Sequence, residues 1–170
     1  MHITAMENGK QFVEQYLDRN SPLEVLDVGS FDVNGSLRPL FEESTWEYVG
    51  LDCTGGPEDN VDSHLNPDGT FPFLDDSFDV VVSSSCLEHD QVFWRTFEEM
   101  IRVTRPGGLI YLLVPSKGGY HGYPGDCWRF MEDAYPALAK AFPEVELLEH
   151  HITATGNWGD NVGVFAKKVL

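Results

Sequence analysis

The stretch that decides the fold is VLDVGSFDVNG, at residues 25–35. Its apolar, β-branched first half ends in an acid and a glycine, which predicts a strand that leads into a ligand-binding loop. Gly29 permits backbone conformations that a side chain would forbid, and Asn34-Gly35 is a second strong turn signal. In an α/β sheet, a nucleotide-like cofactor binds at the carboxyl end of the first strand. The other parts of such a site are expected further along the chain.

Length and composition indicate one globular domain over residues 1–170, long enough to bury a core. The formal net charge of −17 argues against a nucleic-acid backbone or an anionic membrane surface as a partner, since both would be repelled. An acidity that serves only solubility explains this charge more simply than a specific acidic patch does.

The three cysteines, Cys53, Cys86 and Cys127, are odd in number, widely spaced and without a C-x-x-C pair. They indicate a reducing compartment and no disulfide framework. The sequence shows neither a signal peptide nor an apolar run long enough to span a membrane. A cytoplasmic enzyme or binding domain is therefore expected.

Helical and strand patterns alternate along the chain, which predicts right-handed crossovers and a mostly parallel sheet. Apolar residues at helical spacing predict helices over residues 5–19, 91–105 and 132–142, and a short helix over 36–43. Buried β-branched runs predict strands over residues 25–28, 48–52, 78–83 and 109–114. A short edge strand is expected within residues 60–65, and an antiparallel pair over 145–152 and 162–169.

Two segments predict loops of unusual character. Residues 54–60 are rich in turn formers and lack a helical period, so a loop is expected where a doubly wound fold usually has a helix. Residues 115–131 begin with PSKGGYHGYPGDCWRF, and a loop this long is more often functional than connecting. We expect this loop on the substrate side, while the helix within residues 1–20 covers the sheet or the mouth of the cofactor site.

Four motifs occur in the order in which one known family has them. They are VLDVGS (25–30), YVGLD (48–52), FPFLDDSFDVVVSSSCLEH (71–89) and EEMIRVTRPGGLIYLLVP (98–115). Together they resemble the small, type 11-like class I S-adenosylmethionine-dependent methyltransferases, and GSFDVNGSLRP and HGYPGDCWRF resemble a bacterial subgroup of them. The resemblance, over residues 25–115, implies an α/β, Rossmann-like doubly wound fold in three layers. Its sheet has seven strands and is mostly parallel, with an antiparallel last strand.

The chain departs from this family in the cofactor loop, which usually runs D-x-G-x-G-x-G. Phe31 takes the second glycine position and Val33 the third. A phenylalanine does not readily adopt the positive φ that glycine allows. The loop is therefore expected to turn differently, through Asn34-Gly35.

The resemblance implies that S-adenosylmethionine binds at the ends of the first, second and fourth strands. Gly29 and Ser30 would offer backbone groups to its methionine part, and Asp27 would lie below its amino group. A tight turn and a loop cap are the alternatives for these residues. Asp52 is the strongest candidate, since a carboxylate at this strand end can accept both ribose hydroxyl hydrogens; a solvated surface aspartate is its alternative.

Further candidates complete the implied cofactor site. Cys53 would lie beside the adenine, although a lone thiol more often serves packing. The adenine amino group would be bound by Asp62 or Asn66. The cofactor's amino-acid end would be lined by Ser83, Ser84 and Ser85, whose alternative role is polar capping of the strand end.

The acceptor side is expected to use the histidines and the long loop. Methyl transfer is an in-line displacement, so positioning supplies much of the acceleration, and a hydroxyl acceptor also needs a base. The candidates for this base are His89, His121 and Asp126. A satisfied histidine at a helix start is nearly as good an explanation of His89.

The aromatic residues of the long loop predict a substrate wall formed by Tyr120, Tyr123, Trp128 and Arg129. Arg129 would bind a carboxylate or phosphate. The alternative is that Trp128 and Phe130 only anchor the loop on the core. The set His121, Asp126 and Cys127 matches no zinc spacing, so no metal site is predicted.

The expected function is S-adenosylmethionine-dependent methylation of a small polar acceptor, at oxygen rather than at another atom. The main alternative is an inactive binding or regulatory module with the same fold, suggested by Phe31 and the loop at 54–60. A third hypothesis, dinucleotide binding, is disfavoured because the phosphate-cradling glycines are missing. The large substrate-capping insertions of the family are absent, so a homodimer is an open expectation.

Overall fold

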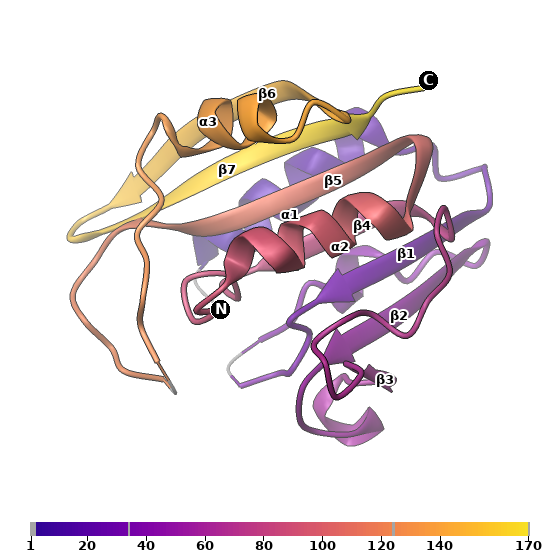
Figure 1. Ribbon diagram of the computed structural model, residues 1–170, viewed down its shortest axis with the longest axis horizontal. Helices are drawn as coiled ribbons and strands as arrows, with labels where there is room; N and C mark the ends of the chain where they lie inside the picture. The colour runs from indigo at the N-terminus through magenta and orange to yellow at the C-terminus, as the bar shows by residue number, and fades with distance from the viewer. Residues whose placement is uncertain (1–2, 34, 124, 170) are drawn as a thin grey trace.

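The computed structural model describes residues 3–33, 35–123 and 125–169. Asn34, one half of the second predicted turn, lies outside these residues. The described chain forms a seven-stranded sheet in the order β3-β2-β1-β4-β5-β7-β6, with β7 antiparallel to both of its neighbours (Figure 1). The strands are β1 (Leu23–Val28), β2 (Trp46–Asp52), β3 (Ser63–His64), β4 (Phe78–Ser84), β5 (Thr104–Lys117), β6 (Val145–Thr155) and β7 (Trp158–Lys167). The predicted fold class is confirmed, including the inserted antiparallel last strand.

The centre of the sheet is buried on both faces because the middle of β4 and of β5, such as Val80–Val82 and Ile110–Val114, is a continuous apolar run. β1 pairs in parallel with β2 on one side and with β4 on the other. Successive side chains of a strand point to opposite faces, so Leu26 and Val28 enter one core and Val25 the other. Asp27 follows the same alternation and enters the apolar layer on the Val25 side.

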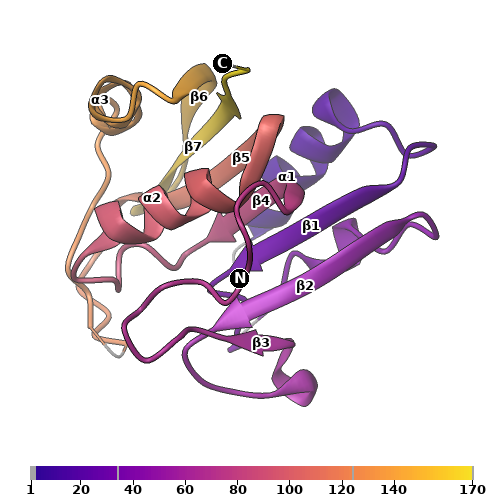
Figure 2. The same cartoon turned by 45° about the vertical axis from the view of Figure 1, so that its right-hand side comes forward.

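Helices cover both faces of the sheet and give the predicted three layers (Figures 1 and 2). One face is covered by α1 (Ile3–Tyr16), and the other by α2 (Phe93–Val103) and α3 (Ala134–Ala141). All three lie within the ranges expected for them or within two residues of those ranges. In the part of the chain that the structure describes, no helix is both long and apolar enough to cross a membrane.

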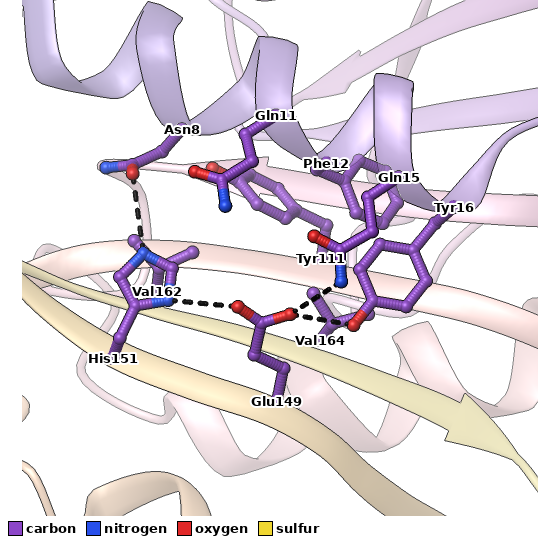
Figure 3. A pocket seen from close by; sticks show the side chains of 10 residues that line it. All are labelled: Asn8, Gln11, Phe12, Gln15, Tyr16, Tyr111, Glu149, His151, Val162 and Val164. Atoms are coloured by element: carbon purple, nitrogen blue, oxygen red, sulfur yellow. Dashed lines mark hydrogen bonds and ion pairs between the residues drawn. The ribbon is translucent and has the colours of Figure 1, made fainter.

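The N-terminal helix is fixed to the sheet by polar side chains as well as by the buried Phe12. The Tyr16 hydroxyl donates to Glu149 Oε2 at 2.8 Å, and Asn8 Nδ2 donates to Thr153 Oγ1 at 3.0 Å. Figure 3 shows Asn8 and Tyr16 of α1 on one side of a pocket and Glu149 of β6 on the other. Of the two predicted positions for this helix, the structure therefore shows the one over the sheet.

The helix predicted over residues 36–43 is only one 3₁₀ turn, η1 (Arg38–Leu40). Pro39 occupies its first turn, and Phe41 then leaves the helical conformation to enter the core beside Trp46, with 6.2 Å between the ring centroids. The turn η2 (Pro57–Asp59) lies within the predicted loop, and β3 is the predicted edge strand. No α-helix therefore lies between β1 and β3 in the described residues.

The two C-terminal strands form the predicted antiparallel pair, with a tighter connection than expected. Thr155 pairs with Trp158, so only two residues turn the chain, and Gly156 has a φ of +61°. β5 is longer than its predicted core of 109–114 because Thr104 already pairs with Phe78, across a register irregularity.

Candidate active site

The carboxyl ends of β1, β2 and β4 lie at one edge of the sheet because these strands are parallel. The long segment between β5 and α3 hangs from this same edge in Figure 1. The hairpin turn between β6 and β7 reaches this edge as well, since Lys117 at the end of β5 pairs with Gly159. All the predicted site residues that the structure describes lie on these strand ends or on the loops that follow them.

The loop after β1 approaches the end of β4 so closely that only glycine fits at position 29. Gly29 has a φ of +79°, and a Cβ there would lie 2.4 Å from both Cβ and Sγ of Cys86. The amide hydrogens of Gly29 and Ser30 donate to the Leu51 carbonyl at 2.9 and 3.2 Å. A backbone contact from Gly29 to a ligand would therefore come from its carbonyl oxygen.

The loop accommodates Phe31 without a positive φ, while the predicted turn at Asn34-Gly35 includes Asn34, which lies outside the described residues. Phe31 is not among the described residues with positive φ, whereas Gly35 has a φ of +121°. The Gly35 amide donates to Asp32 Oδ1 at 2.6 Å, which closes the turn. The Phe31 ring packs against Gly55, where a Cβ would lie 2.5 Å from the ring. Gly35 thus has a positive φ in this loop, whereas the family usually has a glycine at the position of Phe31.

Asp52 is held in place at the end of β2 by backbone amides. Its Oδ2 accepts from the Phe31 amide at 3.2 Å, and its Oδ1 accepts from the Cys53 amide at 2.6 Å and the Thr54 amide at 3.3 Å. A carboxylate oxygen has two lone pairs, so further hydrogen bonds can be accepted. The Cys53 thiol beside it is exposed, and its pKa is raised by partial burial and by Asp52.

Asp27 lies in a buried network below the loop and is 4% exposed. The Tyr48 hydroxyl donates to its Oδ2. Burial raises the pKa of Asp27 to about 6, while the Tyr48 hydrogen bond and the charge of Arg38 oppose the rise. The loop-cap alternative is therefore wrong for Asp27, because its hydrogen bond joins two strands and not a turn.

Arg38 connects this network to the corner after β2. Its guanidinium lies 4.4 Å from the centroid of the Tyr48 ring and donates to the side chains of Asn60 and Asp62. Asp62 Oδ2 also accepts the Gly50 amide at 2.8 Å. This oxygen already binds two donors, so an adenine amino group would have to bind Oδ1, and the role of Asp62 at the adenine stays a prediction. Asn66, the other adenine candidate, donates to Thr70 in a local turn.

Asn60 is one of the residues of this network that the sequence did not reveal. It is buried with a left-handed φ of +70°, and its Nδ2 donates to the Ser30 carbonyl at 2.9 Å. Arg38 and Tyr48 were missed as well. A positive φ is unusual for residues other than glycine, but asparagine adopts it more often than most. The one signal in the sequence was therefore an asparagine in a turn-rich segment.

The three serines at the end of β4, Ser83 to Ser85, have three different environments. Ser83 Oγ donates to the Val28 carbonyl at 2.8 Å, so it caps a strand, as the alternative interpretation held. Ser85 is exposed and has a φ of +54°. The Oγ atoms of Ser84 and Ser30 are buried without a hydrogen-bond partner among the described residues. Buried polar atoms are rarely left unpaired, so each of these two hydroxyls is expected to meet a water or another polar group.

Glu88, His89 and His121 come together on the acceptor side. Glu88 is 1% exposed, and burial raises its pKa to about 7. His89 Nε2 lies 3.7 Å from Glu88 Oε1, and His89 Nδ1 contacts the Gly125 carbonyl. The imidazole of His121 lies 4.9 Å from that of His89 and stacks on Trp158, with centroids 5.8 Å apart. Since a carbonyl only accepts, Nδ1 carries the hydrogen and Nε2 is the free acceptor in neutral His89.

Asp126 and Arg129 bind each other and are not available as predicted. Arg129 Nη2 donates to Asp126 Oδ2 at 2.7 Å and to the Gly119 carbonyl at 2.9 Å. The guanidinium holds the pKa of Asp126 well below its usual range, so this carboxylate is too weak a base to take a hydroxyl proton. The predicted substrate carboxylate or phosphate at Arg129 meets the same objection, because Asp126 occupies that position.

Trp128 anchors the long loop, as the alternative interpretation proposed. Its Nε1 donates to the Asp90 carbonyl at 2.8 Å, and its ring contacts Phe93 at 5.5 Å between centroids. Phe130 is buried in the core. The other two members of the predicted wall, Tyr120 and Tyr123, are 82% and 52% exposed.

The rejected zinc set of His121, Asp126 and Cys127 is not assembled. Asp126 is bound by Arg129, and Cys127 Sγ points to the His89 carbonyl at 4.0 Å. A different set of three side chains lies close enough together to hold a metal ion. One ligand atom from each of Glu88, His89 and His121 lies within 4.8 Å of the others.

Comparison with known proteins gives one family match, described as "Methyltransferase domain", over residues 26–112. An uncharacterized methyltransferase of Mycolicibacterium gilvum is 38% identical over 99 residues, which are 53% of this chain and 38% of the relative. One of Mycobacterium sp. (strain KMS) is 41% identical over 95 residues, 52% of this chain and 37% of the relative. The match thus spans little more than a third of the relatives' length.

Two solved structures share the fold at low sequence identity. One is Burkholderia thailandensis 1,6-didemethyltoxoflavin-N1-methyltransferase with bound 1,6-didemethyltoxoflavin and S-adenosylhomocysteine. It has a TM-score of 0.75 and 17% identity and covers 97% of this chain and 79% of its own. The other, the [4+2]-cyclase SpnF, has a TM-score of 0.76 and 15% identity and covers 98% of this chain and 82% of its own.

Proposed function

This chain belongs to the methyltransferase domain family, and from that premise we propose that it transfers a methyl group from S-adenosylmethionine to a small polar acceptor. The atom that receives the methyl group is a hydroxyl oxygen. The observation that carries this proposal is the Asp52 carboxylate, fixed by three backbone amides at the end of β2. Its position next to the glycine loop of β1 is the one at which a carboxylate binds ribose hydroxyls in this type of sheet.

The residues present fit S-adenosylmethionine in the kinds of group they offer. Asp52 accepts the two ribose hydroxyl hydrogens, and each such bond to a charged acceptor is stronger than a neutral one. Ser84 and Ser30 gain partners for their buried hydroxyls, which have none among the described residues. The Gly29 carbonyl accepts from the ammonium group. The Cys53 thiol and the exposed Ser85 lie at the margin of the same edge.

When bound, S-adenosylmethionine supplies an electrophilic methyl group on a sulfonium. The chain's own contribution is to place the acceptor in line with that group and to remove its proton. His89 Nε2 is the atom for the second task, because the Gly125 carbonyl holds the hydrogen on Nδ1 and orients the ring. The exposed Tyr123, whose ring meets that of His89 edge to face at 6.5 Å, lies where an acceptor would approach.

Calorimetric titration with S-adenosylmethionine and S-adenosylhomocysteine tests the cofactor site. Asp52→Ala is expected to weaken binding by about 10- to 100-fold, from the loss of about 1.5–3 kcal/mol of charge-assisted hydrogen bonding. Glu47→Ala is the matched control, since Glu47 is an exposed acid at the other end of β2. Equal affinities of the Asp52→Ala variant and the wild type would contradict the proposed site. No binding to the wild type at millimolar ligand would contradict the enzyme and leave the binding-module alternative.

The oxygen specificity is tested separately, with labelled S-adenosylmethionine and a panel of small hydroxyl, amine and thiol acceptors. His89→Asn is expected to slow turnover of a hydroxyl acceptor by about 100-fold or more without changing cofactor affinity. Amine acceptors that need no base would be affected much less. Methylation confined to amines or thiols would show that the acceptor atom is wrong, while the cofactor site would stand.

A further inference from the structure

We propose that Glu88, His89 and His121 form a binding site for a divalent transition-metal ion, of which Zn²⁺ is the best match. Two histidines and one glutamate are a ligand set typical of zinc sites that keep one coordination position open. The binding of the ion is independent of the proposed function. Only its consequence for turnover depends on that function.

The distances between the three residues suit this ion. Their ligand atoms lie within 4.8 Å of one another, and the Glu88 Oε1 to His89 Nε2 distance is 3.7 Å. In a tetrahedral site with metal–ligand bonds of about 2.1 Å, the ligand atoms are about 3.4 Å apart. The required contraction is small and falls on His121, whose side chain is exposed and stacks on Trp158.

The groups around the ligands are those that metal sites require. A metal-binding histidine usually donates its other ring N–H to a carbonyl or carboxylate, which fixes the ring and the tautomer. His89 does this through Nδ1, which meets the Gly125 carbonyl and leaves Nε2 for the ion. Glu88 is almost completely buried, and its Oε2 has no hydrogen-bond partner among the described residues. A carboxylate so deeply buried needs a positively charged partner, and an ion bound at Oε1, close enough to share with Oε2, would supply it.

The site also bridges two parts of the chain that are far apart in sequence. Glu88 and His89 follow β4, and His121 comes from the long loop after β5. Backbone bonds already join these segments, because the amides of Cys127 and Trp128 donate to the Glu88 carbonyl at 2.7 and 3.2 Å. A bound ion would therefore stabilise a loop position that exists without it. The chain's net charge of −17 would favour the approach of a cation.

Metal binding and base catalysis use the same atom, since His89 Nε2 cannot hold a metal and a proton together. In the metal-bound form, an acceptor hydroxyl in the open coordination position loses its proton more readily, and the proton passes to water. Turnover would then change with zinc while cofactor affinity would not.

The test is metal titration of the whole chain without cofactor or acceptor, by calorimetry with Zn²⁺ and by the visible absorption of bound Co²⁺. We expect one ion per chain and an absorption typical of tetrahedral nitrogen and oxygen ligands. His121→Ala and Glu88→Gln should each weaken binding by at least about 10-fold, the size of loss seen when a ligand or its support is removed. His64→Ala is the matched control, because His64 is exposed on β3 and lies outside the cluster.

Thermal unfolding gives a second readout. Zn²⁺ should raise the melting temperature of the wild type and of His64→Ala but not that of His121→Ala, because a ligand that binds only the folded state stabilises it. The proposal is overturned if the wild type binds no ion at 100-fold excess metal, or if either ligand variant binds as tightly as the wild type. Neither result would touch the cofactor site, which the Asp52 titration tests on its own.

Discussion

Two corners of the molecule satisfy their polar groups in opposite ways. The first corner surrounds β2 and comprises residues 31–62. The second lies between β4 and the long loop and comprises residues 83–89 and 118–130. In the first corner, Arg38 donates to Asn60 and Asp62, and each of these also binds the adjoining backbone. In the second corner, the atoms Ser84 Oγ and Glu88 Oε2 are buried and have no hydrogen-bond partner among the described residues. A corner with saturated hydrogen bonds is held by the protein itself, whereas buried unpaired groups are stabilised only when something binds them.

The difference also explains how the chain manages without the glycine-rich loop of its family. Side-chain hydrogen bonds fix the first corner where Phe31 and Val33 replace flexible glycines. The backbone amides of Phe31, Cys53 and Thr54 hold Asp52 at the end of β2 without help from an α-helix. The second corner keeps the family's L-E-H motif, and there the buried Glu88 Oε2 has no hydrogen-bond partner among the described residues.

The largest expected effect comes from the position that joins the two corners. Gly29→Ala introduces a Cβ at 2.4 Å from Cys86 on a backbone with a φ of +79°. We expect a loss of about 3 kcal/mol in unfolding free energy, from about 1–2 kcal/mol of left-handed strain plus overpacking. Gly69→Ala is the matched control, since Gly69 has a φ of +86° and a methyl group added there would meet nothing within 4 Å. Urea denaturation measures both variants, and equal losses would show that the two corners are not in tight contact.

The next effect is a pH dependence from Asp27, which binds Tyr48 of the first corner, in addition to the decline that the raised pKa of Glu88 gives in the second corner. The pKa of Asp27 is about 6 in the folded chain and about 3.9 when unfolded, so the folded state binds more protons between these values. Tyr48 and Arg38 face this carboxyl and lower its pKa, and Asp52 raises it. Stability from this group is full below about pH 4 and is lost as the pH rises through about 6, by about 2–3 kcal/mol in all.

Asp27→Asn should abolish that part of the pH profile, as urea denaturation between pH 4 and pH 7 would reveal. Glu47→Gln, an exposed change on β2, serves as the control and should keep the wild-type decline. A profile that Asp27→Asn leaves unchanged would mean that this carboxyl is not held in the buried network.

The smallest effect separates the two ends of the long loop. Trp128→Ala removes the bond to the Asp90 carbonyl and the contact with Phe93, so a loss of about 1–2 kcal/mol is expected. Tyr120 is 82% exposed, and Tyr120→Ala should change the unfolding free energy by less than about 0.5 kcal/mol. Urea denaturation and limited proteolysis of the loop would compare them. Similar losses in both variants would mean that the loop is anchored along its whole length.

Much of the fold could be predicted because its signals are local. Buried β-branched runs, amphipathic helices and turn residues depend on neighbours only a few positions away. The strands were predicted too short, most clearly β5, because pairing beyond the apolar core depends on the partner strand. The helix over 36–43 failed for a related reason, since the burial of Phe41 beside Trp46 outweighs helical periodicity.

The candidate site likewise contains some contacts with a local signal in the sequence and others without one. The pairing of Asp126 with Arg129 was visible as an i, i+3 spacing, and its neglect led to the wrong roles for both residues. The contact between Arg38 and Tyr48 had no such signal, since these residues come from different elements. A shared fold does not settle chemistry either, because one of the similar structures is named a cyclase.

The sequence by itself determined most of the segments that form strands and helices, the acid at the end of β2 and the turn residues beside the positions where the family has glycines. Those features follow from residue type and short-range backbone preference. Only the tertiary structure decided which polar groups find partners. It also brought Glu88, whose Oε2 has no partner among the described residues, close to His89 and His121. That outcome depends on burial and on distances between segments far apart in the chain. Burial matters because hydrogen bonds and charges are strongest, and unpaired groups most costly, away from water.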